Sequence, residues 1–162
     1  MEFASIISPG YKIALFLHIL AVVLAFGPTF GYGFFFSVAS QFPRATPAII
    51  TGVQKVDRYL VTPGMIVLLV AGIYLQTDGD WDASTAFISV GYLAIISLFA
   101  LQGAFFKPQT RKAKELAERD LKAGDTLSDE FNAVSERLSK VGGLAGLIVV
   151  VTVFFMAYKP FL

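Results

Sequence analysis

The sequence predicts an all-α protein, a transmembrane four-helix bundle with a cytoplasmic helical extension between the third and fourth helices. Hydrophobic residues make up 56% of the 162 residues and charged residues only 15%, whereas a soluble domain has about a quarter charged residues. The charges avoid four long segments, and an apolar run of about 20 residues spans the hydrocarbon core of a bilayer as a helix. Barrel strands alternate in polarity, and lipid offers no partner for a free backbone group, so each run is expected to be helical.

We expect one membrane domain over residues 1–162. Its spans are expected at about 11–39, 59–76, 84–106 and 141–158. The first span has one charged residue, Lys12, at its start, and the second opens V-T-P-G and is uncharged. The third follows the acidic turn D-G-D-W-D, in which Asp82 or Ser84 can cap the helix. The fourth is uncharged from V-G-G-L-A-G to F-F-M-A-Y.

Proline and glycine mark sites of bending and close packing. Pro28 in the first span and Pro63 in the second remove a backbone donor, so each predicts a helix kink. Two pairs have the small-x-x-x-small spacing that lets helices approach closely: Gly27 with Gly31, and Gly142 with Gly146. Together with the large apolar surface of four helices, these faces predict a homodimer.

Residues 107–140 form the only sizeable polar segment, and we expect a charged helical hairpin there. The first helix should stop at Gly124. The second should begin with Ser128 as its N-cap and acidic residues in its first turn. Apolar residues could form a narrow seam between the helices: Leu116, Leu121, Leu127, Phe131, Val134 and Leu138.

Basic residues predict the orientation, because lysine and arginine are retained on the cytoplasmic side. Three lie between the first and second spans and eight lie in 107–140, against Lys12 and Lys159 on the other side. Both termini are therefore expected outside the cytoplasm. The net charge of +1 suggests no nucleic-acid partner, and the absence of cysteine excludes disulfides and thiolate sites.

His18, the only histidine, lies inside the first apolar run. It follows Tyr11 by seven residues, which places it about 10 Å below the interface at the helical rise. An ionisable group at that depth usually faces the bundle interior and indicates a functional site. It could bond a carbonyl of a neighbouring helix, ligate haem iron, or belong to a proton or solute path.

Few other groups could take part in chemistry. Met156 falls at a similar depth in the fourth span, and a His18–Met156 pair could hold haem b. The spans offer no further ligand, so no metal site is expected, and no catalytic set or phosphate loop indicates an enzyme. Gln102 could bridge helices, and Asp57 could pair with Arg58 beside Lys55 at the inner interface.

The segments L-H-I-L-A-V-V-L-A-F-G-P, V-T-P-G with A-G-I-Y-L, the basic inner loop and F-F-M-A-Y-K-P resemble the bacterial membrane proteins grouped as domain of unknown function 2269. The more specific parts are Leu17-His18 and M-x-x-K-P, Met156 to Pro160. The resemblance covers nearly the whole chain and implies a small four-span protein of the bacterial plasma (inner) membrane. The early histidine is also similar to that of four-span haem proteins of the membrane-type protoporphyrinogen oxidase and copper-resistance D groups. Those carry further histidines or an intramembrane lysine, which this sequence lacks.

Three functions compete at this point. The first is a non-catalytic scaffold, or a protein that handles a small solute or ion, with a polar site near His18. The second is a haem-binding redox protein with His18 as axial ligand. The third is an adaptor that docks a cytosolic protein through 107–140. The lipid bilayer is a further expected partner, because it surrounds the four spans.

Overall fold

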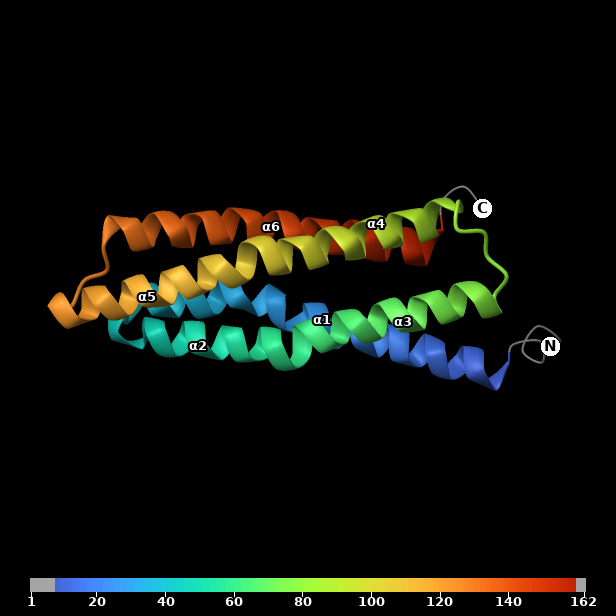
Figure 1. Ribbon diagram of the computed structural model, residues 1–162, viewed down its shortest axis with the longest axis horizontal. Coiled ribbons are helices and arrows are strands. Elements are labelled where there is room, and N and C mark those ends of the chain that lie inside the picture. Colours follow the sequence, from blue (N-terminus) through green and yellow to red (C-terminus); the bar gives the residue numbers. More distant parts are fainter. Residues whose placement is uncertain (1–7, 160–162) are drawn as a thin grey trace.

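The computed structural model describes residues 8–159, and every regular element within them is helical. The elements form a long bundle in which the start of α1, the end of α6 and the α3–α4 connection share one end (Figure 1). The helices are α1 Pro9–Gln41, α2 Thr46–Val56, α3 Thr62–Asp78, α4 Ala86–Leu101, α5 Lys107–Ala123 and α6 Asp129–Tyr158. The predicted all-α class is confirmed.

Four helical stretches are long and apolar enough to cross a membrane. They are Pro9–Ala39, Pro43–Asp78, Ala86–Ala123 and Asp129–Tyr158. Each contains one of the four apolar runs in the sequence. The predicted four-span bundle is therefore confirmed, and Pro160, the last residue of the M-x-x-K-P pattern, lies outside the described residues.

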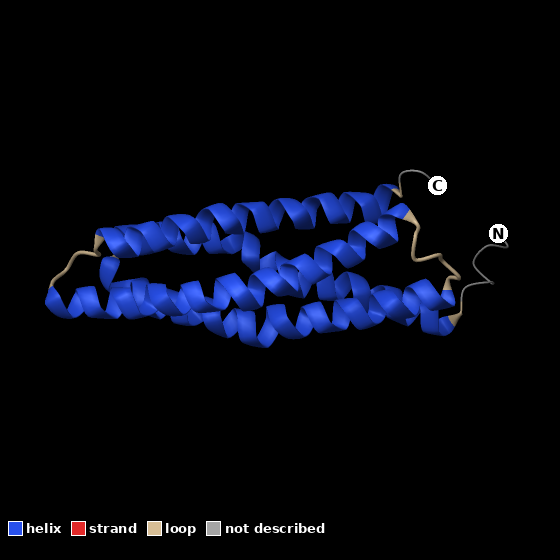
Figure 2. Cartoon of the chain, turned by 45° about the horizontal axis from the view of Figure 1, so that its top comes forward, coloured by secondary structure: helices blue, strands red, loops and turns tan. Residues whose placement is uncertain are grey.

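Two of these stretches are continuous only because a widened turn joins two helices. A π-turn at Asp57–Val61 links α2 to α3, and another at Gln102–Phe106 links α4 to α5. At about 1.5 Å per residue, each combined rod is longer than the roughly 30 Å hydrocarbon core. The surplus forms a helical extension at the end away from the α3–α4 connection (Figure 2).

Residues 46–56, for which the sequence predicted no element, form helix α2 in this extension. The reason is tertiary. Ile50, 1% exposed, packs into a cluster built from α5 and the start of α6. The cluster's other buried members are Ala113, Leu116, Ala117, Phe131, Val134 and Leu138. Most of the predicted seam is thus buried, but it packs against a third helix as well as within the hairpin.

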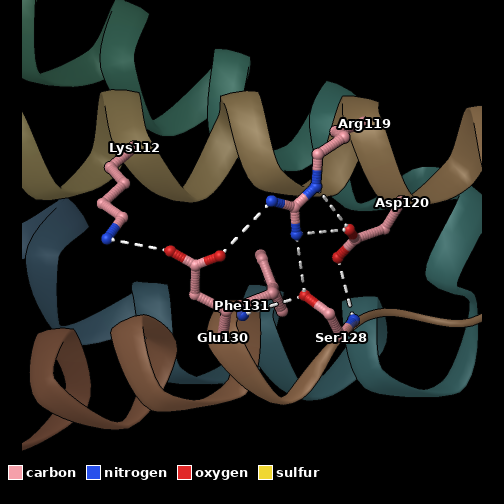
Figure 3. A network of polar contacts seen from close by, with 6 residues as sticks. All are labelled: Lys112, Arg119, Asp120, Ser128, Glu130 and Phe131. Carbon is pink, nitrogen blue, oxygen red and sulfur yellow. Dashed lines mark hydrogen bonds and ion pairs between the residues drawn. The ribbon is translucent and has the colours of Figure 1, made fainter.

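A polar network closes the hairpin turn (Figure 3). The hydroxyl of Ser128 accepts a hydrogen bond from the Phe131 amide at 3.3 Å, which is the predicted N-cap. The Ser128 amide donates to Asp120 at 2.8 Å, and Arg119 donates to both Asp120 and Glu130. Hydrogen bonds from Ser128, and then those from Arg119, lower the pKa of Asp120 to about 2.

In the membrane-spanning part the four helices form two pairs, α1 with α3 and α4 with α6. An apolar cluster joins the pairs near the middle of the bundle. Its buried members are Ala25, Phe26, Val61, Met65, Ile95, Leu98 and Val149. Ala25 lies against Gly64, where a Cβ would come within 3.0 Å of the alanine methyl, so α1 and α3 approach closely. Between this cluster and the α3–α4 connection the two pairs enclose a cavity.

Candidate functional site

The cavity lies in the half of the bundle that carries the α3–α4 connection. Its volume is about 440 Å³. All four spanning helices line it, and most of the wall is apolar: Ile19 and Val22 from α1, Leu69 from α3, Ile88 and Ile95 from α4, and Val153 from α6. The cavity therefore offers an apolar molecule a site between the two helix pairs.

His18 contributes the polar group deepest along α1 in this wall. Its half-buried imidazole lies against Gly72 of α3, where a Cβ would come within 3.3 Å of Cε1. The ring interacts with the main-chain carbonyl of Leu68. Its Nδ1 atom is buried and has no hydrogen-bond partner among residues 8–159. An interior-facing His18 was predicted, and the contacts show one nitrogen left unsatisfied beside the cavity.

Several other polar groups of the cavity lie nearer the connection. The Tyr92 hydroxyl donates to Oε1 of Gln76 at 2.5 Å, and the Gln76 amide donates to the Trp81 carbonyl at 3.3 Å. Lys159 places Nζ 4.9 Å from the ring centroid of Trp81 and 5.2 Å from that of Phe87. The apolar interior thus meets a polar rim with one cation, which sequence reasoning did not predict.

Met156 lines the same cavity from α6. Its terminal methyl occupies the space over Gly91 of α4, where a Cβ would collide with it. The fold therefore brings the two predicted ligand residues, His18 and Met156, to one cavity from different helix pairs. Within residues 8–159 no group of three or more histidine, cysteine or acidic residues is placed to hold a metal ion.

The glycines singled out from the sequence make few contacts within the chain. A Cβ at Gly27 or Gly142 would meet nothing within 4 Å, and one at Gly31 would meet only Phe35 of the same helix. Gly146 alone faces another helix, with a ring carbon of Phe30 3.6 Å from its Cβ position. For Gly27, Gly31 and Gly142 the predicted role in helix packing stays a prediction.

The two prolines occupy different settings. Pro28 lies inside α1, and the next residue, Thr29, donates from its hydroxyl to the Phe26 carbonyl at 2.6 Å. Pro63 stands in the first turn of α3, directly after the π-turn Asp57–Val61.

A second polar cluster lies where the spanning part meets the extension. Among the described residues Asp57 forms no ion pair with Arg58 or Lys55, so the predicted pairing is wrong. Instead the Tyr32 hydroxyl of α1 donates to Oδ1 of Asp57 at 2.7 Å, and the Gln102 side chain interacts with the same carboxylate. Arg58 lies with its guanidinium carbon 5.8 Å from the Tyr59 ring centroid.

A repeated spacing in the sequence could have revealed this cluster. In D-R-Y-L-V-T-P and Q-G-A-F-F-K-P a polar residue precedes a proline by six positions. Both polar residues, Asp57 and Gln102, begin a π-turn.

Four apolar helices, with a charged extension at one end and a cavity between helix pairs, define a multi-pass α-helical integral membrane protein. The chain belongs to the family described as predicted integral membrane protein (DUF2269), whose family model matches residues 12–160. The resemblance read from the sequence is confirmed. Comparison with curated proteins and with solved structures gave no match, and the remoter similarity to haem proteins stays a prediction.

Proposed function

We propose that the protein binds a small, largely apolar molecule in the cavity between α1, α3, α4 and α6, with His18 as its polar contact. The observation that carries this proposal is the unpartnered, buried Nδ1 of His18 beside a cavity of about 440 Å³. The role is non-catalytic: a scaffold or a carrier of a small solute.

The walls and the volume support a ligand of this class. Small-molecule sites are typically cavities of about 300–1,000 Å³ with apolar walls and a few polar groups that fix orientation. A buried polar atom without a hydrogen bond costs about 1–3 kcal/mol, so a ligand that bonds Nδ1 recovers part of that cost. Most buried side-chain polar atoms have a protein or water partner, so the unpartnered Nδ1 supports a binding role for His18.

The test is photo-crosslinking of the detergent-purified protein with an alkyl phenol that carries a diazirine. We expect labelled peptides from α1, α3, α4 and α6, and strong loss of labelling in Gly72→Val, whose side chain fills the space beside the imidazole. Gly52→Ala is the matched control, because a Cβ at Gly52 meets nothing within 4 Å. Equal labelling of Gly72→Val and the control, or labelling confined to lipid-facing residues, rejects the site.

A second candidate is a haem-binding redox protein. It is favoured by the position of His18 and Met156 on the walls of one cavity, because a histidine and a methionine can serve as the two axial ligands of haem b. A visible absorption spectrum tests it. A Soret band that is lost in His18→Ala and altered in Met156→Leu supports haem, whereas a colourless preparation after supply of haem rejects it.

We place the protein in a bacterial plasma membrane with both termini outside and residues 107–140 in the cytoplasm. Residues 107–140 carry eight basic residues, and their turn between α5 and α6 lies at the end of the bundle opposite the start of α1 and the end of α6 (Figure 1), which supports this orientation by the rule of positive cytoplasmic loops. Reporter fusions at Lys122 and at the termini test the orientation.

A homodimer and an adaptor role are further parts of the proposal. The open faces at Gly27 and Gly142 support a homodimer, which crosslinking in native membranes would test. The extension buries its apolar seam against α2, so a cytosolic partner would bind its charged surface. Pull-down with the intact chain and with a deletion of 112–136 tests that role.

A further inference from the structure

The second polar cluster is built by two prolines acting on two neighbouring helical rods. Pro63 and Pro108 lack an N–H, and a proline ring also crowds the carbonyl four residues before it. Each rod widens before its proline, so that the Thr62 amide bonds the Asp57 carbonyl and the Lys107 amide bonds the Gln102 carbonyl, both five residues back. Turns of this kind occur frequently at functional sites.

The widened turns bring polar side chains from three segments to one carboxylate. Asp57 accepts the Tyr32 hydroxyl at 2.7 Å, and Gln102 lies beside the same group. Two further polar atoms are buried without a hydrogen bond of normal geometry, Nε2 of Gln102 and Oγ1 of Thr62. Buried groups of this kind are usually satisfied by a protein partner or by ordered water. Because Gln102 lies beside the carboxylate, its Nε2 atom leaves room for a further hydrogen bond next to Asp57.

The cluster is separate from the His18 cavity. Asp57 lies about 30 Å along its rod from Asp78, at about 1.5 Å per residue, which is close to the thickness of the hydrocarbon core. The apolar cluster that includes Phe26 and Met65 lies between the two sites. The nearby cations are on the side of the extension, where Lys55 and Arg58 are exposed on the same rod and Lys107 opens α5. The charged, exposed surface nearest to the cluster is therefore that of the extension.

We propose that Asp57 is a proton-binding carboxyl group, held by Tyr32 and Gln102 at the extension end of the spanning bundle. The proton comes from water on the side of the extension and adds to Oδ2, while Oδ1 keeps the hydrogen bond from Tyr32. One O–H bond forms in the uptake step and the same bond breaks on release, so no other reactant is needed.

The groups around the carboxylate favour a proton over a metal ion. Hard cations take six or more oxygen ligands in proteins, or keep several waters of their own. Here the titratable and charged groups that face Asp57 from the neighbouring elements are Tyr32 of α1, a hydrogen-bond donor, and Lys107 of α5, a cation. Gln102 adds an amide, and within residues 8–159 no group of three or more histidine, cysteine or acidic residues is placed to hold a metal ion.

Infrared difference spectroscopy of the full chain in liposomes, between acidic and alkaline buffer, tests the proposal. We expect a carbonyl band of a protonated carboxyl group that is absent in Asp57→Asn and shifted in frequency in Tyr32→Phe. Asp78→Asn is the matched control, since Asp78 is exposed at the other end of the same rod, and the band should persist there.

Asp57→Glu guards against a folding defect in the asparagine variant, because it should fold and show a displaced band. A band that persists in Asp57→Asn, or spectra without a titrating Asp57 band, would overturn the proposal. So would a band that responds to Na⁺ at constant pH, which would assign a monovalent cation instead. These results are independent of the His18 cavity, whose ligand is tested by crosslinking.

Discussion

Removing the Ile50 side chain should destabilise the extension selectively. Ile50 of α2 is 1% exposed and packs on Ala113 and Ala117 of α5 and on the first turns of α6. Truncation of such a side chain to alanine costs about 2–5 kcal/mol in a water-soluble core, the sum of a lost transfer term and a cavity term. Even the lower bound of about 2 kcal/mol raises the population of the opened extension about 30-fold, because 1.4 kcal/mol corresponds to a tenfold change in an equilibrium constant.

Limited proteolysis at the α5–α6 turn measures that equilibrium, because cleavage tracks the population of the opened form when closing is fast. We expect cleavage of Ile50→Ala to rise at least about 30-fold over the wild type, with the spanning helices unchanged by circular dichroism. Lys55→Ala, an exposed residue on the same helix, is the control. A change no larger than that of Lys55→Ala would refute the reasoning. Burying an apolar side chain gains no transfer free energy in lipid, so that result would place the cluster in the membrane and not in water.

The pH dependence of the hairpin should follow Asp120. The pKa of Asp120 is about 2 in the folded chain against an ordinary value of 3.8, so its contribution to stability is present above about pH 4 and is lost as pH falls towards 2. Limited proteolysis of the hairpin at a series of pH values measures this dependence, and Asp120→Asn should remove it. Ser128→Ala should destabilise α6 by about 1 kcal/mol through loss of the N-cap, measured by urea unfolding of the extension, and an effect below that of an exposed alanine substitution would contradict the cap. Gly91→Val should displace the Met156 methyl and change which α6 residues are labelled by photo-crosslinking in the cavity. An unchanged labelling pattern would show that Met156 does not contact the bound molecule.

The helical class, the four spans and the N-cap at Ser128 were predictable because they depend on local composition and on covalent restrictions. An uncharged run of about 20 residues has one stable form in lipid whatever surrounds it. The glycine pairs could be found by spacing, but spacing does not say what faces them, and among residues 8–159 a Cβ at Gly27 or Gly142 would meet nothing within 4 Å.

The pairing of Asp57 is the clearest case in which proximity along the chain misled. Arg58 and Lys55 are its neighbours in sequence, yet consecutive helical residues point in different directions, and the carboxylate meets Tyr32 of another helix instead. Helix α2 was missed for a related reason. Its apolar face is buried only when it packs against α5 and α6, which lie more than 50 residues further along the chain.

The sequence by itself determined that this chain has four membrane-spanning runs, that Ser128 caps the helix after the turn of the hairpin, and that a lone histidine lies within an apolar run. Tertiary structure alone decided that His18 and Met156 share a cavity, and that two proline-widened turns meet at one carboxylate. The physical reason is range: burial in lipid and capping act within a few residues, whereas a cavity or a polar cluster exists only between helices distant in sequence.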